Sequence, residues 1–267
     1  MVRSLYSAAS GMMAQQTNVD VIANNLANVN TIGYKSQSAE FKSLLYQDLQ
    51  AKTTSANGEN KPVSAQVGLG SRISSITSHY TQGSANATDG TTDFLINGMG
   101  FFAIENIDGN VYYTRNGNFF LSVDTEGTVL CTAEGYPVLS SEGQPIVLDP
   151  QYQSTKITVD GDGNICYPDE SNNIGIKIGL YQFPNPSGLT KVGNSYLAES
   201  DASGTAINEE DGVVSKSKLK QGYLESSNVN VATEMVNLIT AQRAYELCSK
   251  AITTSDTMME QANNLKR

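Results

Sequence analysis

Apolar residues at both ends of the chain recur with the seven-residue spacing of helices that pack on other helices. The N-terminal set consists of Leu5, Met12, Val19 and Leu26, followed three residues later by Ala8, Ile22 and Val29, with Gln15 breaking the second row. The C-terminal set consists of Val231, Leu238, Tyr245, Ile252 and Met259, followed by Ala241, Cys248 and Ala262. These spacings predict two long helices that pair as a coiled coil.

The helix-breaking residues leave both ends of the chain uninterrupted. All seven prolines lie between Pro62 and Pro186, and 22 of the 23 glycines lie between Gly33 and Gly222. Gly33 is placed to end the first helix, because glycine readily takes the left-handed conformation found there. Asn230 is placed to cap the second helix, with Glu234 in its first turn.

The middle of the chain changes to short apolar runs with a period of two residues. The runs cover residues 94–96, 101–104, 111–113, 119–121, 128–130, 156–159 and 176–178. Turn pairs of the Asn-Gly, Asp-Gly and Glu-Gly type separate many of them, as at Asn97-Gly98 and Asn116-Gly117. This alternation is typical of an antiparallel, hairpin-rich β domain.

We therefore expect an α+β fold in which long terminal helices pair as a coiled-coil core beside a central, mostly antiparallel β domain. Residues 1–35 and 223–267 would form the helical core, 36–80 a linker and extended connecting segment, and 81–222 a β-rich outer domain. Within the connecting segment, residues 51–66 have the composition of a flexible or extended linker.

Helices of this length raise the question of what covers them. A helix of about 30 residues spans on the order of 45 Å, more than a small domain can cover. Part of each apolar stripe is therefore expected to face other molecules. The alternative is an intramolecular hairpin that only closes the fold.

The charge distribution argues against a nucleic acid partner. The formal net charge is −10, and residues 51–214 hold seven basic against nineteen acidic side chains. A nucleic-acid-binding protein normally displays a basic patch. The N-terminal segment lacks the apolar run of a secretory signal peptide, and no stretch approaches the roughly 18 apolar residues of a membrane span. We expect neither a cleaved signal nor a membrane span.

The motifs that resemble chemical sites are incomplete. Gly98-Met99-Gly100 with Ala103 matches a degenerate dinucleotide fingerprint, but a strand-like run follows where the phosphate-binding helix should begin. The segment Asp160-Gly161-Asp162-Gly163-Asn164 resembles a calcium loop, yet the sixth and twelfth positions hold Ile165 and Ser171 instead of Gly and Glu.

The remaining candidates for catalysis are single residues. His79 is the one histidine, and no nucleophile motif such as GxSxG accompanies it. Cys131, Cys166 and Cys248 are far apart in sequence and form no CxxC pair. We expect no catalytic, cofactor-binding or metal site, and no enzyme activity.

Several motifs together resemble one known family. Residues 23–35 read ANNLANVNTIGYK, 98–102 GMGFF, 113–119 YTRNGNF and 221–230 QGYLESSNVN, and EMV at 234–236 precedes AQRAYE at 241–246. In this order they are similar to the motifs of bacterial flagellar rod and hook proteins. The resemblance covers essentially the whole chain and is weakest across residues 140–215.

The resemblance implies a structural subunit of the flagellar basal body that polymerises into a helical tube and transmits torque from motor to hook. Chain length, the SSNVNV segment and the polar insertion at about 46–66 resemble the distal-rod branch of the family. The alternatives within the family are a proximal-rod paralogue and a hook-type subunit.

The family also implies partners and a location. These are other copies of the chain, other rod proteins and hook subunits, the flagellar type III exporter and ring bushing proteins. The rod lies outside the cytoplasmic membrane, in the periplasm or cell envelope.

The residues expected to form the assembly interface are the large apolar members of the two stripes and two asparagines of the N-terminal motif. They are Leu5, Met12, Val19, Ile22, Asn24, Asn25, Leu26, Val29, Met235, Leu238, Tyr245, Ile252 and Met259. We expect these stripes to be poorly ordered in the free monomer and to become helical when neighbouring copies cover them. Two other classes, a secreted hydrolase or carbohydrate-binding β protein and a cytoplasmic coiled-coil adaptor, fit the sequence less well.

Overall fold

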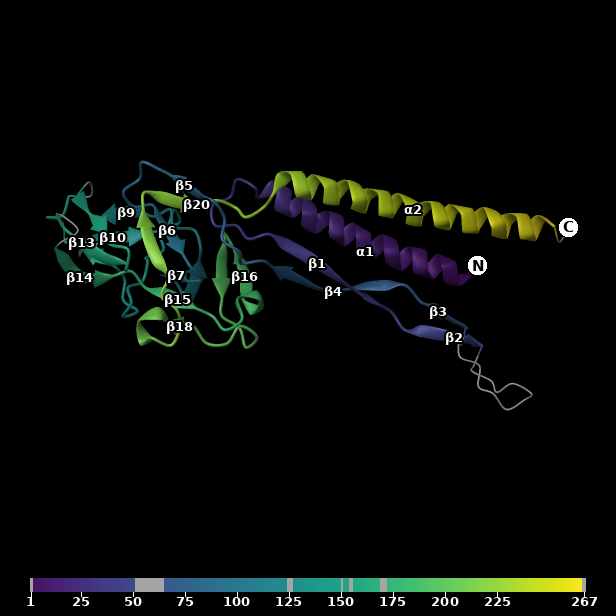
Figure 1. Cartoon of the computed structure of the whole chain (residues 1–267), viewed down its shortest axis with the longest axis horizontal. Coiled ribbons are helices and arrows are strands. Elements are labelled where there is room, and N and C mark those ends of the chain that lie inside the picture. Colours follow the sequence, from purple (N-terminus) through teal and green to yellow (C-terminus); the bar gives the residue numbers. More distant parts are fainter. Residues whose placement is uncertain are drawn as a thin grey trace. The chain divides into compact units, whose positions relative to one another are not determined.

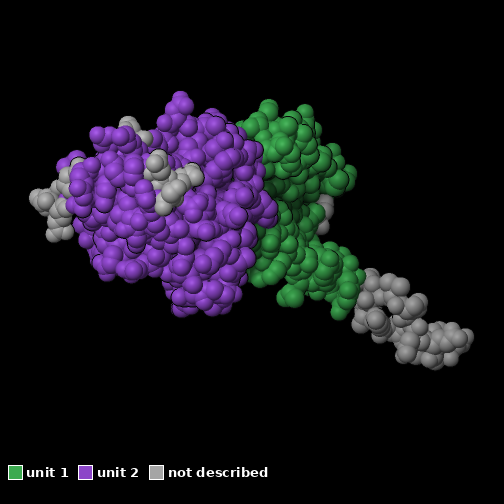
Figure 2. Space-filling view, turned by 60° about the vertical axis from the view of Figure 1, so that its left-hand side comes forward, with its two compact units in different colours: residues 1–27, 37–78, 230–267 green, residues 28–36, 79–229 purple. Residues whose placement is uncertain are grey.

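A computed structural model describes residues 2–50, 65–123, 127–149, 151–153, 156–168 and 172–265. The chain folds into two compact units. Unit 1 comprises residues 1–27, 37–78 and 230–267, and unit 2 comprises residues 28–36 and 79–229 (Figure 2). Both units are discontinuous in sequence, so the chain passes between them four times.

Unit 1 contains the two terminal helices and a ribbon of strands. Helix α1 (Val2–Ala27) lies beside α2 (Val231–Asn264), and the start of α1 and the end of α2 lie at the same end of the pair (Figure 1). The strands are β1 (Gln37–Ser43), β2 (Tyr46–Gln50), β3 (Ala65–Gly68) and β4 (Ser71–Ser78). Strand β1 pairs with β4 and β2 with β3, both antiparallel, and β1 and β4 pack on α1.

The start of α2 matches the predicted cap, whereas α1 ends before the predicted stop at Gly33. Asn230 caps α2, since its side chain accepts a hydrogen bond from the backbone N–H of Thr233 at 3.2 Å, which confirms the predicted cap. Helix α1 ends at Ala27, so the expectation that its stripe extends to Val29 was wrong. The Asn28 side chain instead accepts from the Thr31 hydroxyl at 3.1 Å, a local bond that competes with helical hydrogen bonding.

Unit 2 contains short strands joined by tight turns. They are β5 (Ala85–Ala87), β6 (Phe94–Asn97), β7 (Phe101–Glu105), β8 (Val111–Thr114), β9 (Phe120–Val123), β10 (Thr128–Cys131), β11 (Val147–Leu148), β12 (Thr158–Val159), β13 (Asn164–Cys166), β14 (Asn173–Lys177), β15 (Leu180–Gln182), β16 (Thr190–Gly193), β17 (Tyr196–Ala198), β18 (Ile207–Asn208), β19 (Lys218–Gln221) and β20 (Tyr223–Glu225). The 3₁₀ turns Pro186–Gly188 and Glu209–Asp211 also lie between these strands.

The strands of unit 2 form several small sheets in which the described pairings are antiparallel. The largest has six strands in the order β16-β17-β8-β7-β15-β18. Strands β11-β10-β9 and β12-β13-β14 form two further sheets, and β19 pairs with β6 and β20 with β5.

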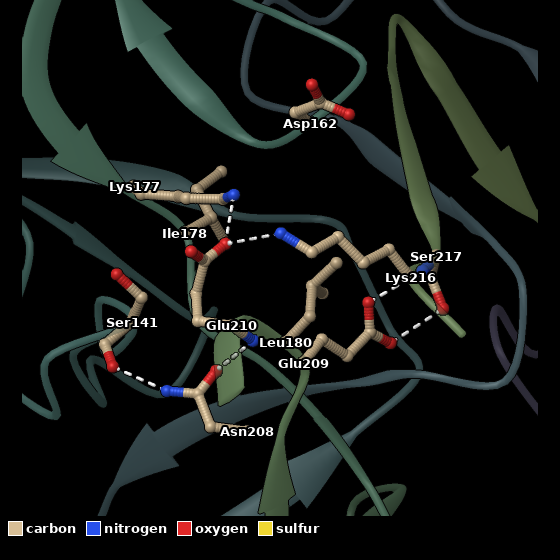
Figure 3. Close-up of a pocket in the computed structure, with 10 residues that line it drawn as sticks. All are labelled: Ser141, Asp162, Lys177, Ile178, Leu180, Asn208, Glu209, Glu210, Lys216 and Ser217. Atoms are coloured by element: carbon tan, nitrogen blue, oxygen red, sulfur yellow. Dashed lines mark hydrogen bonds and ion pairs between the residues drawn. The ribbon is translucent and has the colours of Figure 1, made fainter. Parts of the chain in front are cut away.

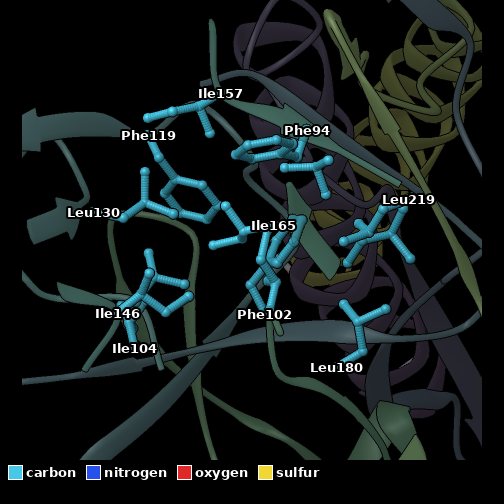
Figure 4. Close-up of a cluster of buried hydrophobic side chains, with 14 of the residues drawn as sticks. Phe94, Phe102, Ile104, Phe119, Leu130, Ile146, Ile157, Ile165, Leu180 and Leu219 are labelled. Carbon is cyan, nitrogen blue, oxygen red and sulfur yellow. The ribbon is translucent and has the colours of Figure 1, made fainter. Parts of the chain in front are cut away.

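Strand β7 explains how the core of unit 2 is organised. Successive side chains of a strand point to opposite faces, so Phe102 and Ile104 enter one apolar cluster while Phe101 and Ala103 enter another. The first cluster also holds Phe94, Phe119 and Ile165 (Figure 4). These four residues of β7 are fully buried, so the strand is covered on both faces.

The predicted order of an N-terminal helix, a central antiparallel β region and a C-terminal helix is confirmed. The run at 156–159 contributes only Thr158–Val159 to a strand, and the run at 176–178 begins inside β14. Residues 36–80, expected to connect the helix and sheet as extended chain, contain the four strands of the unit 1 ribbon. The linker expected at 51–66 lies, apart from its last two residues, outside the described residues.

Candidate assembly surface and buried ion cluster

The two helices of unit 1 meet along a row of small and polar residues. Ser4 Oγ lies 3.3 Å from Ser255 Oγ, a Cβ placed on Gly11 would lie 3.1 Å from Cys248 Sγ, and Asn25 Nδ2 lies 3.3 Å from Glu234 Oε2. Each step of seven residues along α1 is matched by a step of seven back along α2. The helices are therefore antiparallel, and their contact follows one regular register.

The large apolar residues of the predicted stripes lie outside this row. The half-buried ones are Leu5, Met12, Val19, Leu26, Leu238, Ile252 and Met259. Ile22 and Asn25 are buried, whereas Asn24, Met235 and Tyr245 are exposed. Val29 lies in the turn after α1 and belongs to unit 2. Unit 1 thus gathers most of the predicted interface residues on its helices but leaves many of them only partly covered.

Helix α2 is covered on one side only. Ala241 is its one buried residue among those described. On its other faces Val236, Ile239, Leu247 and Met258 have exposed fractions of 60, 55, 66 and 52%. Large apolar side chains this exposed along one helix indicate a surface that another molecule covers.

A groove and the strand ribbon add to the exposed apolar surface of unit 1 that α2 provides. The groove lies between the helices and is lined by Gln16, Val19, Gln242, Tyr245 and Glu246. The ribbon exposes Phe41, Leu45, Tyr46, Leu49, Leu69 and Ile76. A two-stranded ribbon is marginally stable alone, so a ribbon with exposed aromatic and aliphatic side chains also suits packing against another molecule.

Unit 2 contains a buried ion cluster centred on Glu225. One carboxylate oxygen accepts hydrogen bonds from Lys35 Nζ at 2.7 Å and from the Gly83 backbone N–H at 2.8 Å, and the other lies 3.4 Å from Arg115 Nη1. The three charged side chains are at most 5% exposed. Lys35 also donates to the Thr81 carbonyl at 2.9 Å. Buried charges of this kind are tolerated only when they are paired, and Glu225 pairs with both cations, although the buried Arg115 Nε has no hydrogen-bond partner among the described residues.

The residues around the cluster hold both chain segments that enter unit 2. The Gly33 N–H donates to the Glu225 carbonyl at 2.8 Å, and Asn228 accepts from the Ser36 N–H at 2.8 Å while donating to the His79 carbonyl at 2.9 Å. Gly33 has a φ of +68°, and a Cβ there would lie 2.8 Å from the carbonyl carbon of Arg115. Glycine is therefore required at this turn for both reasons.

Burial and charge act in opposite directions within the cluster. Burial lowers the pKa of Lys35, and the Glu225 carboxylate counteracts that shift. Burial likewise lowers the pKa of Arg115, again opposed by Glu225. The single carboxylate therefore serves two buried cations at once, so its loss would leave both without a counter-charge.

A small pocket on unit 2 is lined by polar side chains that hydrogen-bond to one another (Figure 3). Buried Glu209 accepts from the Ser217 N–H at 2.6 Å, the Ser217 hydroxyl at 2.7 Å and Gln182 Nε2 at 2.7 Å. Glu210 bonds to Lys177, which lowers the pKa of the Glu210 carboxyl, and lies 3.7 Å from Lys216 Nζ. These hydrogen bonds hold the loop before β19 in place. The described side chains of the pocket do not form an acid and base pair directed at one substrate position.

The incomplete motifs occupy ordinary structural positions. Gly98 and Gly100 flank the turn between β6 and β7, so a strand follows the glycines, as predicted from the sequence. Asp160 accepts a hydrogen bond from the Gly163 N–H in the turn before β13. In the described part of the chain no three His, Cys, Asp or Glu side chains are grouped to hold a metal ion. Neither α1 nor α2 is apolar enough over sufficient length to cross a membrane.

Three family models match successive parts of the chain. Residues 5–35 match the flagella basal body rod protein model, 95–167 the D1 domain of flagellar hook protein FlgE/F/G, and 220–265 the C-terminal model of flagellar basal body rod FlgEFG proteins. The flagellar basal-body rod protein FlgG of Borreliella burgdorferi is 42% identical over 100% of both chains. The chain belongs to the flagellar basal-body rod protein family. This confirms the resemblance found in the sequence.

Other relatives agree with this assignment. FlgG of Bacillus subtilis is 40% identical over 100% of both chains, and the flagellar hook-basal body complex protein FlhP of the same organism is 30% identical over 100% of both chains. The full-length similarity to FlgG supports the distal-rod branch within the rod family. The protein is accordingly a structural subunit of the flagellar basal-body rod.

The ion cluster joins the three matched segments of the rod family. Lys35 lies in the first, Arg115 in the second and Glu225 in the third. The sequence placed all three residues in family motifs but did not identify them as a buried group. One feature of the sequence could have indicated their burial. Each of the three charged residues lies beside glycine, asparagine or serine in a motif with few other charges.

Proposed function

We propose that copies of this chain polymerise into the helical distal rod through the apolar surface of unit 1. The terminal helices of neighbouring copies would pack as a coiled-coil core, with unit 2 outside it as the β-rich domain. The residues we assign to this interface are the half-buried and exposed members of the predicted stripes that lie in unit 1, together with Val236, Ile239, Leu247 and Met258. Asn25 and Ile22 are already buried within the subunit, so we assign them to its own helix pair.

The observation that supports this proposal is the uneven exposure of apolar side chains. Of the 23 large apolar side chains exposed in the described residues, 16 lie in unit 1. A monomer that kept this surface in water would lose roughly 25 cal/mol for each Å² of apolar area left uncovered. Association between copies removes that cost, and many such contacts per subunit would make a stiff tube.

The wider proposal follows from membership of the rod family. A stiff tube would transmit torque from motor to hook, contact other rod proteins and hook subunits at its ends, and pass through ring bushing proteins in the periplasm or cell envelope. Delivery by the flagellar type III exporter fits a subunit whose terminal helices complete their folding only on assembly. In this account the protein has no catalytic role.

The test is a charge placed on the exposed face of α2. Leu247→Asp introduces a charge where a neighbour is expected, 66% exposed in the subunit, so the subunit itself should fold normally. Sedimentation velocity of the full chain should show association weakened by about 10- to 100-fold, the loss expected when one leucine contact is replaced by a buried charge. The matched control is Thr253→Asp, at an exposed polar position about 120° around the same helix from Leu247.

Unchanged association of the Leu247→Asp variant would contradict the proposal. If Leu247→Asp and the parent chain associate with the same dissociation constant, the α2 face is not an assembly interface. If only Thr253→Asp weakens association, the interface lies on another face of α2.

A further inference from the structure

Buried Asn25 lies where three elements of unit 1 meet. It is 1% exposed. Its Nδ2 donates to the Gln37 carbonyl at 2.8 Å and to Glu234 Oε2 at 3.3 Å, and its Oδ1 accepts from the Gln37 N–H at 2.9 Å. Through these bonds the side-chain amide ties α1 to the start of β1 and to the first turn of α2.

The apolar rows of the two helices cannot fix their own alignment. Leu5, Met12, Val19 and Leu26 repeat every seven residues, as do Leu238, Tyr245, Ile252 and Met259. Sliding α1 by seven residues along α2 would present nearly the same apolar surface again. Some non-repeating feature must distinguish the observed alignment from its slipped alternatives.

The contact at Asn25 is such a feature. In the observed register Asn25 faces Glu234. A slip of one heptad would place Asn25 opposite either Ala241 or Ser227, and Ser227 lies before the start of α2. In either slipped pairing the amide loses its carboxylate acceptor. A single buried polar residue is known to specify helix register in this way.

We propose that Asn25 is the residue that sets the register of the helix pair within each subunit, with Glu234 as its partner. It keeps a subunit's own helices correctly paired among the many near-identical apolar rows of a helical polymer. This inference concerns pairing inside one subunit, and it applies wherever the terminal helices are formed, in the free subunit or in the polymer.

Cys248 provides a direct reporter of register. In the observed pairing it faces Gly11, and the 3.1 Å from a Gly11 Cβ to Cys248 Sγ is close to the span a disulfide requires. Gly11→Cys should therefore form an intrachain disulfide with Cys248 under mild oxidation. Ser4→Cys and Asn18→Cys lie one heptad to either side, about 10 Å away, and should form it at least about tenfold less.

The experiment combines these reporters with Asn25→Leu in the full-length chain. Non-reducing electrophoresis and peptide mapping identify each disulfide, and a dilution series separates intrachain from interchain bonds. We expect Asn25→Leu to raise the Ser4→Cys or Asn18→Cys disulfide, or interchain disulfides, by about tenfold, as loss of a buried hydrogen bond to a charged group would allow. Ala23→Leu, at an exposed position two residues away, should leave the pattern unchanged.

A second pair of variants covers the case in which Asn25→Leu does not fold. Glu234→Leu removes only the α2 acceptor and should permit the same slips, whereas Glu234→Gln keeps an acceptor and should restore the parent pattern. The proposal is overturned if Asn25→Leu and Glu234→Leu still form only the Gly11→Cys disulfide, because the connecting segments then set the register. It is also overturned if Gly11→Cys forms no intrachain disulfide. Sedimentation of the same samples reports separately on the proposed assembly.

Discussion

Unit 1 and unit 2 bury their apolar side chains to very different extents. Among the described residues, 27 of the 32 buried apolar side chains lie in unit 2, whereas 16 of the 23 exposed large apolar side chains lie in unit 1. Unit 2 contains its own core, with β7 covered on both faces. Unit 1 has two long helices, a thin ribbon and little to cover them.

The difference separates two tasks that one chain performs. A unit with a complete core can fold alone and gain little from neighbours, while a unit with an incomplete core gains most of its stability from them. The ion cluster in unit 2 belongs to the first task, because it fixes both entering segments. The apolar faces of α2 and the ribbon belong to the second.

The largest expected effect is the loss of the carboxylate in the ion cluster. Glu225→Gln leaves Lys35 and Arg115 buried without a counter-charge, and removal of one partner from a buried pair costs about 3–5 kcal/mol. Urea unfolding of the full chain, followed by tyrosine fluorescence, should show that loss in the transition of unit 2. Lys216→Ala, at an exposed ion pair, is the control and should change little.

A smaller effect is expected at alkaline pH. Burial, with Glu199 as a lesser cause, raises the pKa of Tyr113 to about 12. In the unfolded chain this tyrosine loses its proton near pH 10, so the unfolded state releases the proton first. The free energy of unfolding should therefore fall by about 2 kcal/mol as pH rises from 10 to 12.

The variant that checks this pH dependence is Tyr113→Phe, which cannot ionise and keeps the ring packing on Phe183. It should be less sensitive than the parent chain over this pH range, as measured by urea unfolding at pH 9, 10, 11 and 12. An equal loss of stability in both proteins would show that Tyr113 does not titrate in the way its burial suggests.

Gly33→Ala should reduce the stability of unit 2 by about 1–3 kcal/mol, because alanine strains the positive φ and its Cβ meets the Arg115 backbone. Thermal unfolding would measure the change. Gly109→Ala is a useful control, since Gly109 also has a positive φ but has open space around it. A similar loss in both variants would mean that the φ alone, and not the close approach to Arg115, sets the cost.

The smallest effect on folding is expected on the exposed face of unit 1. Met258→Gln should change the free energy of unfolding of the monomer by less than about 0.5 kcal/mol, because the side chain is 52% exposed. The same change should weaken association measurably by sedimentation. A clear loss of monomer stability would show that unit 1 uses this residue for its own fold.

The sequence predicted the elements better than it predicted their contacts. Heptad spacing identified both helices, and alternation with X-Gly turns identified β6, β7, β8 and β10, because these signals are local. The ribbon of β1 and β4 was missed as strands. Both of its faces are partly exposed, so it lacks a clear apolar and polar alternation.

The sites were harder to predict because they depend on distant parts of the chain. Lys35, Arg115 and Glu225 are separated by 80 or more residues, and each resembles a surface charge until the fold brings them together. The seam between the helices was missed for a different reason. The heptad pattern is defined by the large apolar residues. The closest contacts between α1 and α2 instead involve the small and polar row that contains Gly11 and Asn25.

We propose that unit 2 is complete by itself while unit 1 is completed by other copies. The most direct test of this proposal compares the full chain with a fragment of residues 28–229, which keeps Lys35, Glu225 and Asn228, by circular dichroism and sedimentation over a range of concentrations. The fragment should be a β-rich monomer, and the full chain should gain helix as it associates. A full chain that stays monomeric at high concentration with its helices fully formed would contradict the account.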